Sequence, residues 1–281
     1  MFRVITAGAL ALMLTACGSM PTRIALEPAT KQGLVEIRVL SVLPQDEVIV
    51  RAETFGASAA LGGGLIGALI DSKVAEGRQN AVQDVLVPFY QSVDDYDFRS
   101  GFERNLGVAL ANGTTLKFAP LERTAMPMMP KVLVERMAAM KVGDGHLTIT
   151  TRYAFTSDFS RLNVTAYAEM KMPGLEKPAY LNTFIYQSRA AGTGGPDSIK
   201  SWSDKKGAAY RAAMDEASRE LIAMVQIDLA ANATDPIDAA KATLEQIDGA
   251  TKRPVSGVVL ATNGERTMLR NAAGNIYSLV Q

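Results

Sequence analysis

Residues 146–170 read HLTITTRYAFTSDFSRLNVTAYAEM, and this stretch decides the fold. Apolar side chains occupy alternate positions over 147–155 and again over 162–170, and a polar segment at 157–160 separates the two runs. Alternation with a period of two is typical of strands that bury one face. A third run of this kind covers about 180–186. The pattern predicts a three-stranded antiparallel meander with one face on a core.

Helical patterns flank the meander on both sides. Three stretches have apolar residues every three or four positions, as on the buried face of a helix: 98–111, 130–141 and 206–231. Two earlier alternating runs, at 35–39 and 48–52, predict a hairpin. Together these elements predict an α+β domain at 33–232, in which an antiparallel or mixed sheet is covered by helices on one side.

The C-terminal part of the chain has a different pattern. Asp235-Pro236 is typical of a helix start and predicts a connecting helix over 233–254. Asn263-Gly264 stands between two apolar runs and is the strongest short-range signal for a tight hairpin. With the run at 276–280 it predicts a three-stranded β module at 255–281. So small a sheet is not very stable alone, so we expect it to dock on the main domain or on a partner.

The N-terminus has the features of an exported chain. Arg3 precedes an uncharged apolar run at 4–13, which has the length of a signal sequence and is too short to span a bilayer. The run ends in Leu14-Thr15-Ala16-Cys17, which holds the only cysteine of the 281 residues. This ending resembles the lipobox of bacterial, and in particular proteobacterial, envelope lipoproteins.

The resemblance implies a processing route and a location. A signal peptide of residues 1–16 would be cleaved between Ala16 and Cys17, and Cys17 would carry acyl chains such as palmitate. Two or more acyl chains anchor a protein stably to a membrane. Gly18 stands where lipoproteins retained in the inner membrane have Asp, so the resemblance implies an outer-membrane protein that faces the periplasm. Residues 17–32, with two prolines and little periodicity, predict a flexible tether.

Composition narrows the kinds of site that we expect. With Cys17 acylated, the mature chain has no thiol for a disulfide, a nucleophile or a zinc-thiolate site. The 29 Lys and Arg residues balance 29 Asp and Glu residues, so no net field favours a nucleic acid. We therefore expect no nucleic-acid partner, no metal and no cofactor.

Residues 55–70 are unusual because they carry no charge. In a helix, their small residues would form one side and their leucines the other: Gly56, Ala60, Gly63, Gly64 and Gly67, against Leu61, Leu65 and Leu69. Small residues at this spacing let another backbone approach closely. The segment is therefore a candidate contact surface. It could pack on the domain's own sheet, touch the outer membrane, pair with a second copy, or form a mobile loop.

Two motifs with a possible chemical role have simpler explanations. Residues 62–67 match G-x-G-x-x-G, but they do not directly follow a strand, as a dinucleotide site requires. Asp94, Asp95 and Asp97 could bind a hard metal or act as an acid/base pair. The positive end of a helix explains the same three carboxylates, and we expect Asp94 or Asp95 to cap the helix at 98–111.

Two further motifs have the same ambiguity. His146 is the only histidine and could serve a hydrolase, but no G-x-S-x-G element accompanies it, and it most simply begins a strand after a turn. Residues 126–130 place three thioethers in a loop. Thioethers suit Cu(I), and they also fill irregular gaps at contact surfaces.

The leading hypothesis is a non-enzymatic, lipid-anchored outer-membrane protein that binds another envelope component or itself, in assembly, transport or maintenance. One alternative is a binding module for a lipid or small apolar ligand, which needs a pocket beside 55–70. The other alternative is an envelope hydrolase, which needs at least two titratable groups converging in a cleft.

Overall fold

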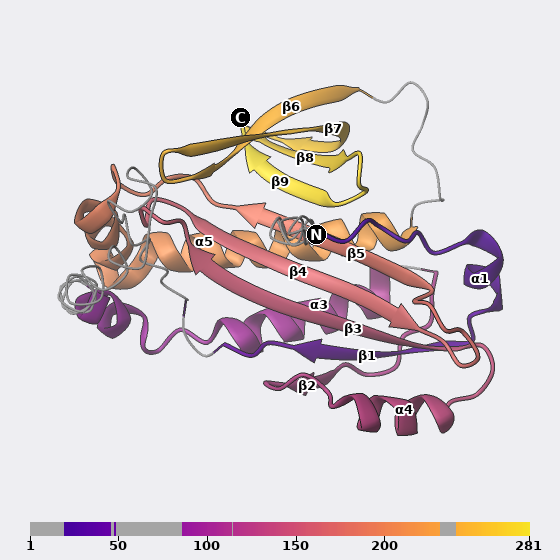
Figure 1. The fold of residues 1–281 in the computed structure, drawn as a ribbon. Coiled ribbons are helices and arrows are strands. Elements are labelled where there is room, and N and C mark those ends of the chain that lie inside the picture. The colour runs from indigo at the N-terminus through magenta and orange to yellow at the C-terminus, as the bar shows by residue number, and fades with distance from the viewer. Residues whose placement is uncertain (1–19, 46–47, 49–85, 114, 231–239) are drawn as a thin grey trace, which may run out of the picture.

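The computed structural model describes residues 20–45, 48, 86–113, 115–230 and 240–281. It has the expected α+β architecture, in which helices cover one face of a large mixed sheet (Figure 1). Residues 86–93 are helical. The other elements are α1 (Pro28–Gly33), β1 (Glu36–Val42), α3 (Phe98–Gly113), β2 (Glu122–Thr124), α4 (Pro130–Ala138), β3 (Asp144–Phe155), β4 (Leu162–Lys171), β5 (Tyr180–Gln187), α5 (Gly195–Ala230), β6 (Lys241–Asp248), β7 (Thr251–Asn263), β8 (Arg266–Asn271) and β9 (Ile276–Val280).

The described strands form one sheet in the order β2-β1-β3-β4-β5-β9-β8-β7-β6. β1 pairs in parallel with β2 and β3, and β5 pairs in parallel with β9. The predicted meander is confirmed as the antiparallel centre, where Leu147 lies opposite Met170 and Val164 opposite Tyr186. Every second residue of β4 is buried, because its apolar positions all point to the same face.

α3 and α5 form the layer behind this face (Figure 1). The core between the two layers includes Leu147 and Val164 from the sheet and Leu106 and Leu221 from the helices. Each such side chain stabilises the fold by roughly 1.5–3 kcal/mol when fully buried. α3 confirms the helix expected at 98–111, and α4 confirms most of the one expected at 130–141.

α5 begins earlier than its apolar stripe predicts. It was expected at 206–231, but it starts at Gly195 and is interrupted over Asp204–Gly207, where the backbone leaves helical geometry. Gly207 has a positive φ of 68°, and a Cβ at this position would collide with the side chain of Val93. A close turn against the chain near Val93 therefore divides the helix in two.

The predicted helix over 233–254 is wrong for the residues that the structure describes. Residues 241–248 form β6, which pairs with the start of β7 across a turn at Gly249, where φ is +57°. The side-chain amide of Gln187 accepts from the Ile247 N–H at 3.0 Å and donates to the Ile247 carbonyl at 2.7 Å. The hairpin with β7, with these two added bonds at Ile247, thus overrides the helix-start signal at 235–236.

The C-terminal meander is confirmed as strands, and it continues the main sheet. Asn263 pairs with Arg266 across the predicted Asn-Gly turn. β9 lies beside β5, with Phe184 opposite Ile276. A second apolar cluster of Ile185, Leu244, Val255, Leu269, Tyr277 and Leu279 fills the other face. β5 is therefore buried at all of its positions, because the C-terminal strands cover the face that the helices leave open (Figure 1).

The flexible tether predicted for 17–32 is wrong over residues 20–32. The Ile24 N–H donates to the Leu181 carbonyl at 2.8 Å, and the Leu181 N–H donates back at 2.9 Å. Residues 20–26, the N-terminal segment, thus pair with β5 at the end that β9 does not reach. Backbone pairing to a buried strand fixes a sequence that has no periodicity of its own.

The proposed first hairpin is described only in part. β1 accounts for its first run, and its described neighbours are the parallel strands β2 and β3. Most of the second run, at 49–52, lies outside the described residues. Val48 is buried in the main core.

A buried carboxylate joins the two ends of the chain to the helical layer. Asp228 of α5 accepts from Tyr180 Oη at 2.8 Å and from Asn182 Nδ2 at 2.7 Å. It also forms ion pairs with Arg23 Nε at 2.9 Å and with Arg270 Nη2 at 3.0 Å. The side chain of Asp228 is fully buried, and both arginine side chains are less than a tenth exposed. We call these five residues the Asp228 cluster.

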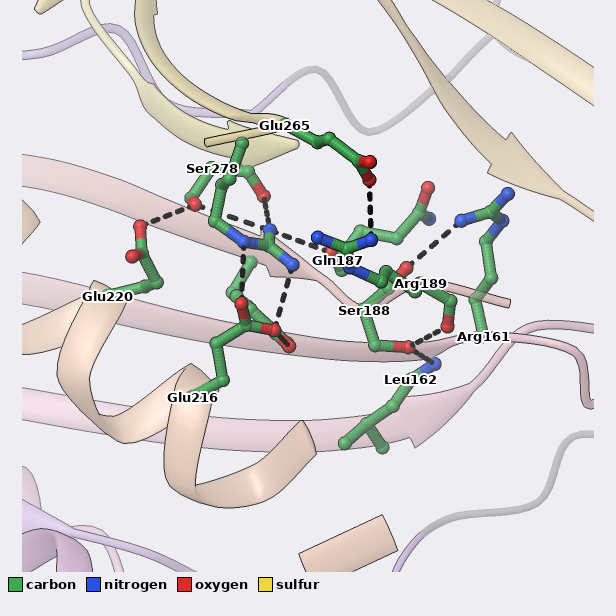
Figure 2. A network of polar contacts seen from close by, with 11 residues as sticks. Arg161, Leu162, Gln187, Ser188, Arg189, Glu216, Glu220, Glu265 and Ser278 are labelled. Atoms are coloured by element: carbon green, nitrogen blue, oxygen red, sulfur yellow. Dashed lines mark hydrogen bonds and ion pairs between the residues drawn. The ribbon is translucent and has the colours of Figure 1, made fainter. Parts of the chain in front are cut away.

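Two more carboxylates on the same side of α5 bind the C-terminal strands (Figure 2). Glu216 forms a bidentate pair with the buried Arg266 at 3.1 and 3.0 Å. Glu220, one turn further along, accepts from Ser278 Oγ at 2.6 Å. The Arg266 guanidinium also lies 4.5 Å from the centre of the Tyr186 ring. Glu220 follows Glu216 by four residues, and Asp228 follows Glu220 by eight. These positions set where the C-terminal strands lie along α5.

We predict that Asp228→Asn lowers the free energy of unfolding by about 3–5 kcal/mol. Removing one member of a buried ion pair leaves the other charge unbalanced, and here two arginines lose their counter-ion. Chemical denaturation followed by circular dichroism measures the change. The matched control is Glu265→Gln, which breaks the exposed pair with Arg189 and is expected to cost less than about 1 kcal/mol. Equal effects of the two substitutions would contradict a central role for the cluster.

Candidate functional site

The lipidation and contact residues expected from the sequence lie outside the described residues. These residues are Ala16 and Cys17 at the cleavage site and Gly56, Ala60, Gly63, Gly64, Gly67, Leu61, Leu65 and Leu69 in the uncharged segment. They remain predictions. The first described residue, Met20, follows Cys17 by three positions.

His146 lies near the start of β3 and is 1% exposed. Among the described residues neither ring nitrogen has a hydrogen-bond partner, and burial lowers the pKa of the imidazole below its ordinary 6.5. Arg136, Arg38 and Lys171 lower this pKa further, while Glu122 opposes them. A group so enclosed and neutral is poorly placed to exchange protons with a substrate.

The aspartates at 94–97 act separately from one another. Asp97 Oδ1 accepts from the Ser100 N–H at 3.0 Å, so this residue caps α3 in place of Asp94 or Asp95. Hydrogen bonding from the side chain of Ser100, and then from its N–H, lowers the pKa of the carboxyl. Asp95 pairs with Arg211 of α5. The contact of Asp97 agrees with the helix-terminus explanation, whereas the expectation that Asp94 or Asp95 is the cap is wrong.

His146 and the aspartates do not converge. Tyr96 packs against Tyr210, which in turn packs against Phe155, the last residue of β3. His146 lies at the opposite end of that strand, nine residues away, which corresponds to about 30 Å of extended chain. In the part of the chain that the structure describes, no three His, Cys, Asp or Glu side chains are grouped as metal ligands.

Three open grooves lie on the described surface. They have volumes of about 430, 560 and 360 Å³. The largest of the three runs between α3 and residues 118–123, and Glu103 lies in its wall. Glu103 is 1% exposed, its pKa is raised by burial, and its nearest cation is Arg123 Nε at 3.8 Å. A carboxyl enclosed to this degree is part of the packing of α3 against β1 rather than an accessible acid.

α4 presents an apolar surface to solvent. Four large apolar side chains on it and on the loop before it are exposed, and we call them the α4 surface: Met126 (76%), Met129 (69%), Val132 (46%) and Val134 (67%). α4 itself has no buried residue, and Arg136 ties it to Glu122 of β2 with hydrogen bonds of 2.8 and 2.7 Å. Four large apolar side chains exposed within nine residues are candidates for contact with another molecule.

The sequence located part of the α4 surface. The thioethers at 126–130 were singled out for their contact role, and two of them are among its most exposed residues. The exposure of Val132 and Val134 has no signal in the sequence, because apolar residues in a helical pattern are expected to face a core. Leu133 and Met137, which were expected to point inward, are only half-buried.

Neither protein-family models nor curated proteins give a match to this chain. Among the described helices, none is both long and apolar enough to cross a membrane.

We predict that the fold loses stability as the pH falls from 7 to 5, and that His146→Leu removes part of this loss. The pKa of His146 is lower in the folded state than in the unfolded chain, so on acidification the unfolded chain takes up the proton first. Stability from the neutral imidazole is therefore present above about pH 6.5 and declines below it. Denaturant titrations at several pH values measure the slope for both proteins. Parallel slopes would show that His146 does not titrate differently in the two states.

Proposed function

We propose that this protein is a lipid-anchored, non-enzymatic component of the bacterial outer membrane, and that its periplasmic body binds another envelope component through the α4 surface. The anchor is inferred from Leu14-Thr15-Ala16-Cys17. The binding role is supported chiefly by one observation: four large apolar side chains are exposed, two on α4 and two on the loop before it, and α4 has no buried residue.

The α4 surface is suited to a protein partner. Methionine side chains are flexible and polarisable, so they adapt to the shape of an apolar surface. α4 is also next to β2, a three-residue strand at the edge of the sheet. Because α4 is held by surface contacts, its outer residues can be changed without removing side chains from the core.

The hydrolase alternative has less support. It needs two titratable groups that converge in a cleft. His146 is enclosed at one end of β3, and the aspartates at 94–97 lie near its other end. The alternative of a lipid-binding pocket beside residues 55–70 stays a prediction, because that segment lies outside the described residues.

The anchor is tested by changing the cysteine. We expect the full chain to fractionate with outer membranes and to carry acyl mass on Cys17, because several acyl chains hold a protein stably in a bilayer. Cys17→Ser is expected to leave an unprocessed precursor that carries no acyl group. Mass spectrometry of the N-terminal peptide provides the readout. An unmodified thiol in the full chain would refute the anchor.

The binding role is tested by crosslinking in intact cells. A photoreactive residue at Met129 or Val134 of the full chain is expected to give a discrete crosslinked product, because both positions lie on the α4 surface. Leu175, which is 53% exposed and lies outside this surface, is the control position. Adding Val132→Glu is expected to reduce the product several-fold without lowering the melting temperature. The same products from Leu175 as from Val134, or none from either, would count against the proposal.

A further inference from the structure

The N-terminal segment is fixed to the fold from its first described residue. Tyr277 Oη donates to the sulfur of Met20 at 3.9 Å, and the Arg23 N–H donates to the Ala273 carbonyl at 2.8 Å. Arg23 enters the Asp228 cluster, and Leu26 is buried in the main core. Gly274 permits this close passage, because a Cβ there would collide with the side chain of Arg23.

Chain length limits how far this segment can be from an anchor at Cys17. Met20 follows Cys17 by three positions in the sequence. An extended chain covers at most ~3.6 Å for each position, so the two Cα atoms lie within about 11 Å of each other. A flexible tether over 17–32 would have allowed a several-fold larger separation. The folded body therefore has little freedom to move away from the lipid.

Residues 20–24 and the turn at 271–275 carry no exposed charged side chain. Arg23 is the only charged residue between Cys17 and Leu26, and its side chain is 9% exposed because it turns inward to Asp228. Met20 and Ile24 are 41% and 38% exposed. The turn beside them, residues 271–275, is also uncharged. A surface of this kind can approach lipid headgroups without the cost of desolvating an ion.

From these observations we infer that the face formed by residues 20–24 and the turn at 271–275 lies directly against the lipid headgroups. This inference depends on the acylation of Cys17 proposed above. We infer a bilayer at this face because acyl chains on Cys17 would hold the lipid within about 11 Å of Met20. Contact of this face with the bilayer also gives the folded body a fixed orientation. Residues 20–26 lie beside β5, and β2, with α4 next to it, is five strand spacings from them, roughly 24 Å.

The test measures contact with lipid at single positions of the acylated full chain. Thr22→Cys and Ala272→Cys, both at exposed positions, are each labelled with a fluorophore and placed in vesicles of phosphatidylethanolamine and phosphatidylglycerol that carry a nitroxide on the headgroup. Val134→Cys on α4 is the matched control. Quenching is expected to be several-fold stronger at the first two positions than at Val134. A melting curve and the acyl mass are recorded for each variant.

A longer connection provides a second measurement. Inserting about ten Gly and Ser residues between Gly18 and Ser19 adds a root-mean-square span of roughly 16–19 Å and leaves Leu14-Thr15-Ala16-Cys17 intact. Quenching at Thr22→Cys is expected to fall several-fold with this insertion. Acylated protein with equal quenching at Thr22, Ala272 and Val134 would overturn the inference while the anchor stands. Protein without acyl mass would overturn both.

Discussion

The buried charge of Asp228 is the constraint on which the arrangement of this chain depends. A carboxylate inside a core must be paired, because an isolated ion costs several kcal/mol to remove from water. Asp228 finds its partners on the N-terminal segment, on β5 and on β8. Lys31 adds to this region by donating to the Leu229 carbonyl at 2.9 Å and the Ala230 carbonyl at 3.1 Å, at the negative end of α5. One helix end thus holds segments from both ends of the chain.

Glu216 and Glu220 extend the same principle along α5. Hydrophobic burial between sheet and helices is strong but does not specify direction. The pairs of Glu216 with Arg266 and of Asp228 with Arg270 join two arginines of one strand to carboxylates on one side of one helix. The C-terminal module, which the sequence predicts to dock on the main domain or on a partner, therefore joins the main sheet in one register, with β9 paired beside β5.

The sequence predicted what local periodicity determines, namely the meander, α3 and the Asn263-Gly264 hairpin. It failed at β6 and at the N-terminal segment. β6 is the first strand of a tight hairpin with β7, and Gln187 adds two hydrogen bonds to Ile247. The N-terminal segment depends on distant residues, Leu181 and Asp228. Neither partnership has a periodic signal. For the candidate site, the methionines at 126–130 were found from their chemistry, whereas the exposure of Val132 and Val134 required the placement of α4 outside the core.

The N-terminal segment is held to the body from Met20 onward, so an anchor at Cys17, as proposed, would move with the body as one unit. Native-state hydrogen exchange of the Ile24 and Leu181 amides tests this claim most directly, because each donates to the other's carbonyl. The account predicts that both amides exchange only on global unfolding, together with the amides of β4. Exchange of the Ile24 and Leu181 amides many-fold faster than that of β4 would show that the N-terminal segment detaches from a folded body, and would contradict the account.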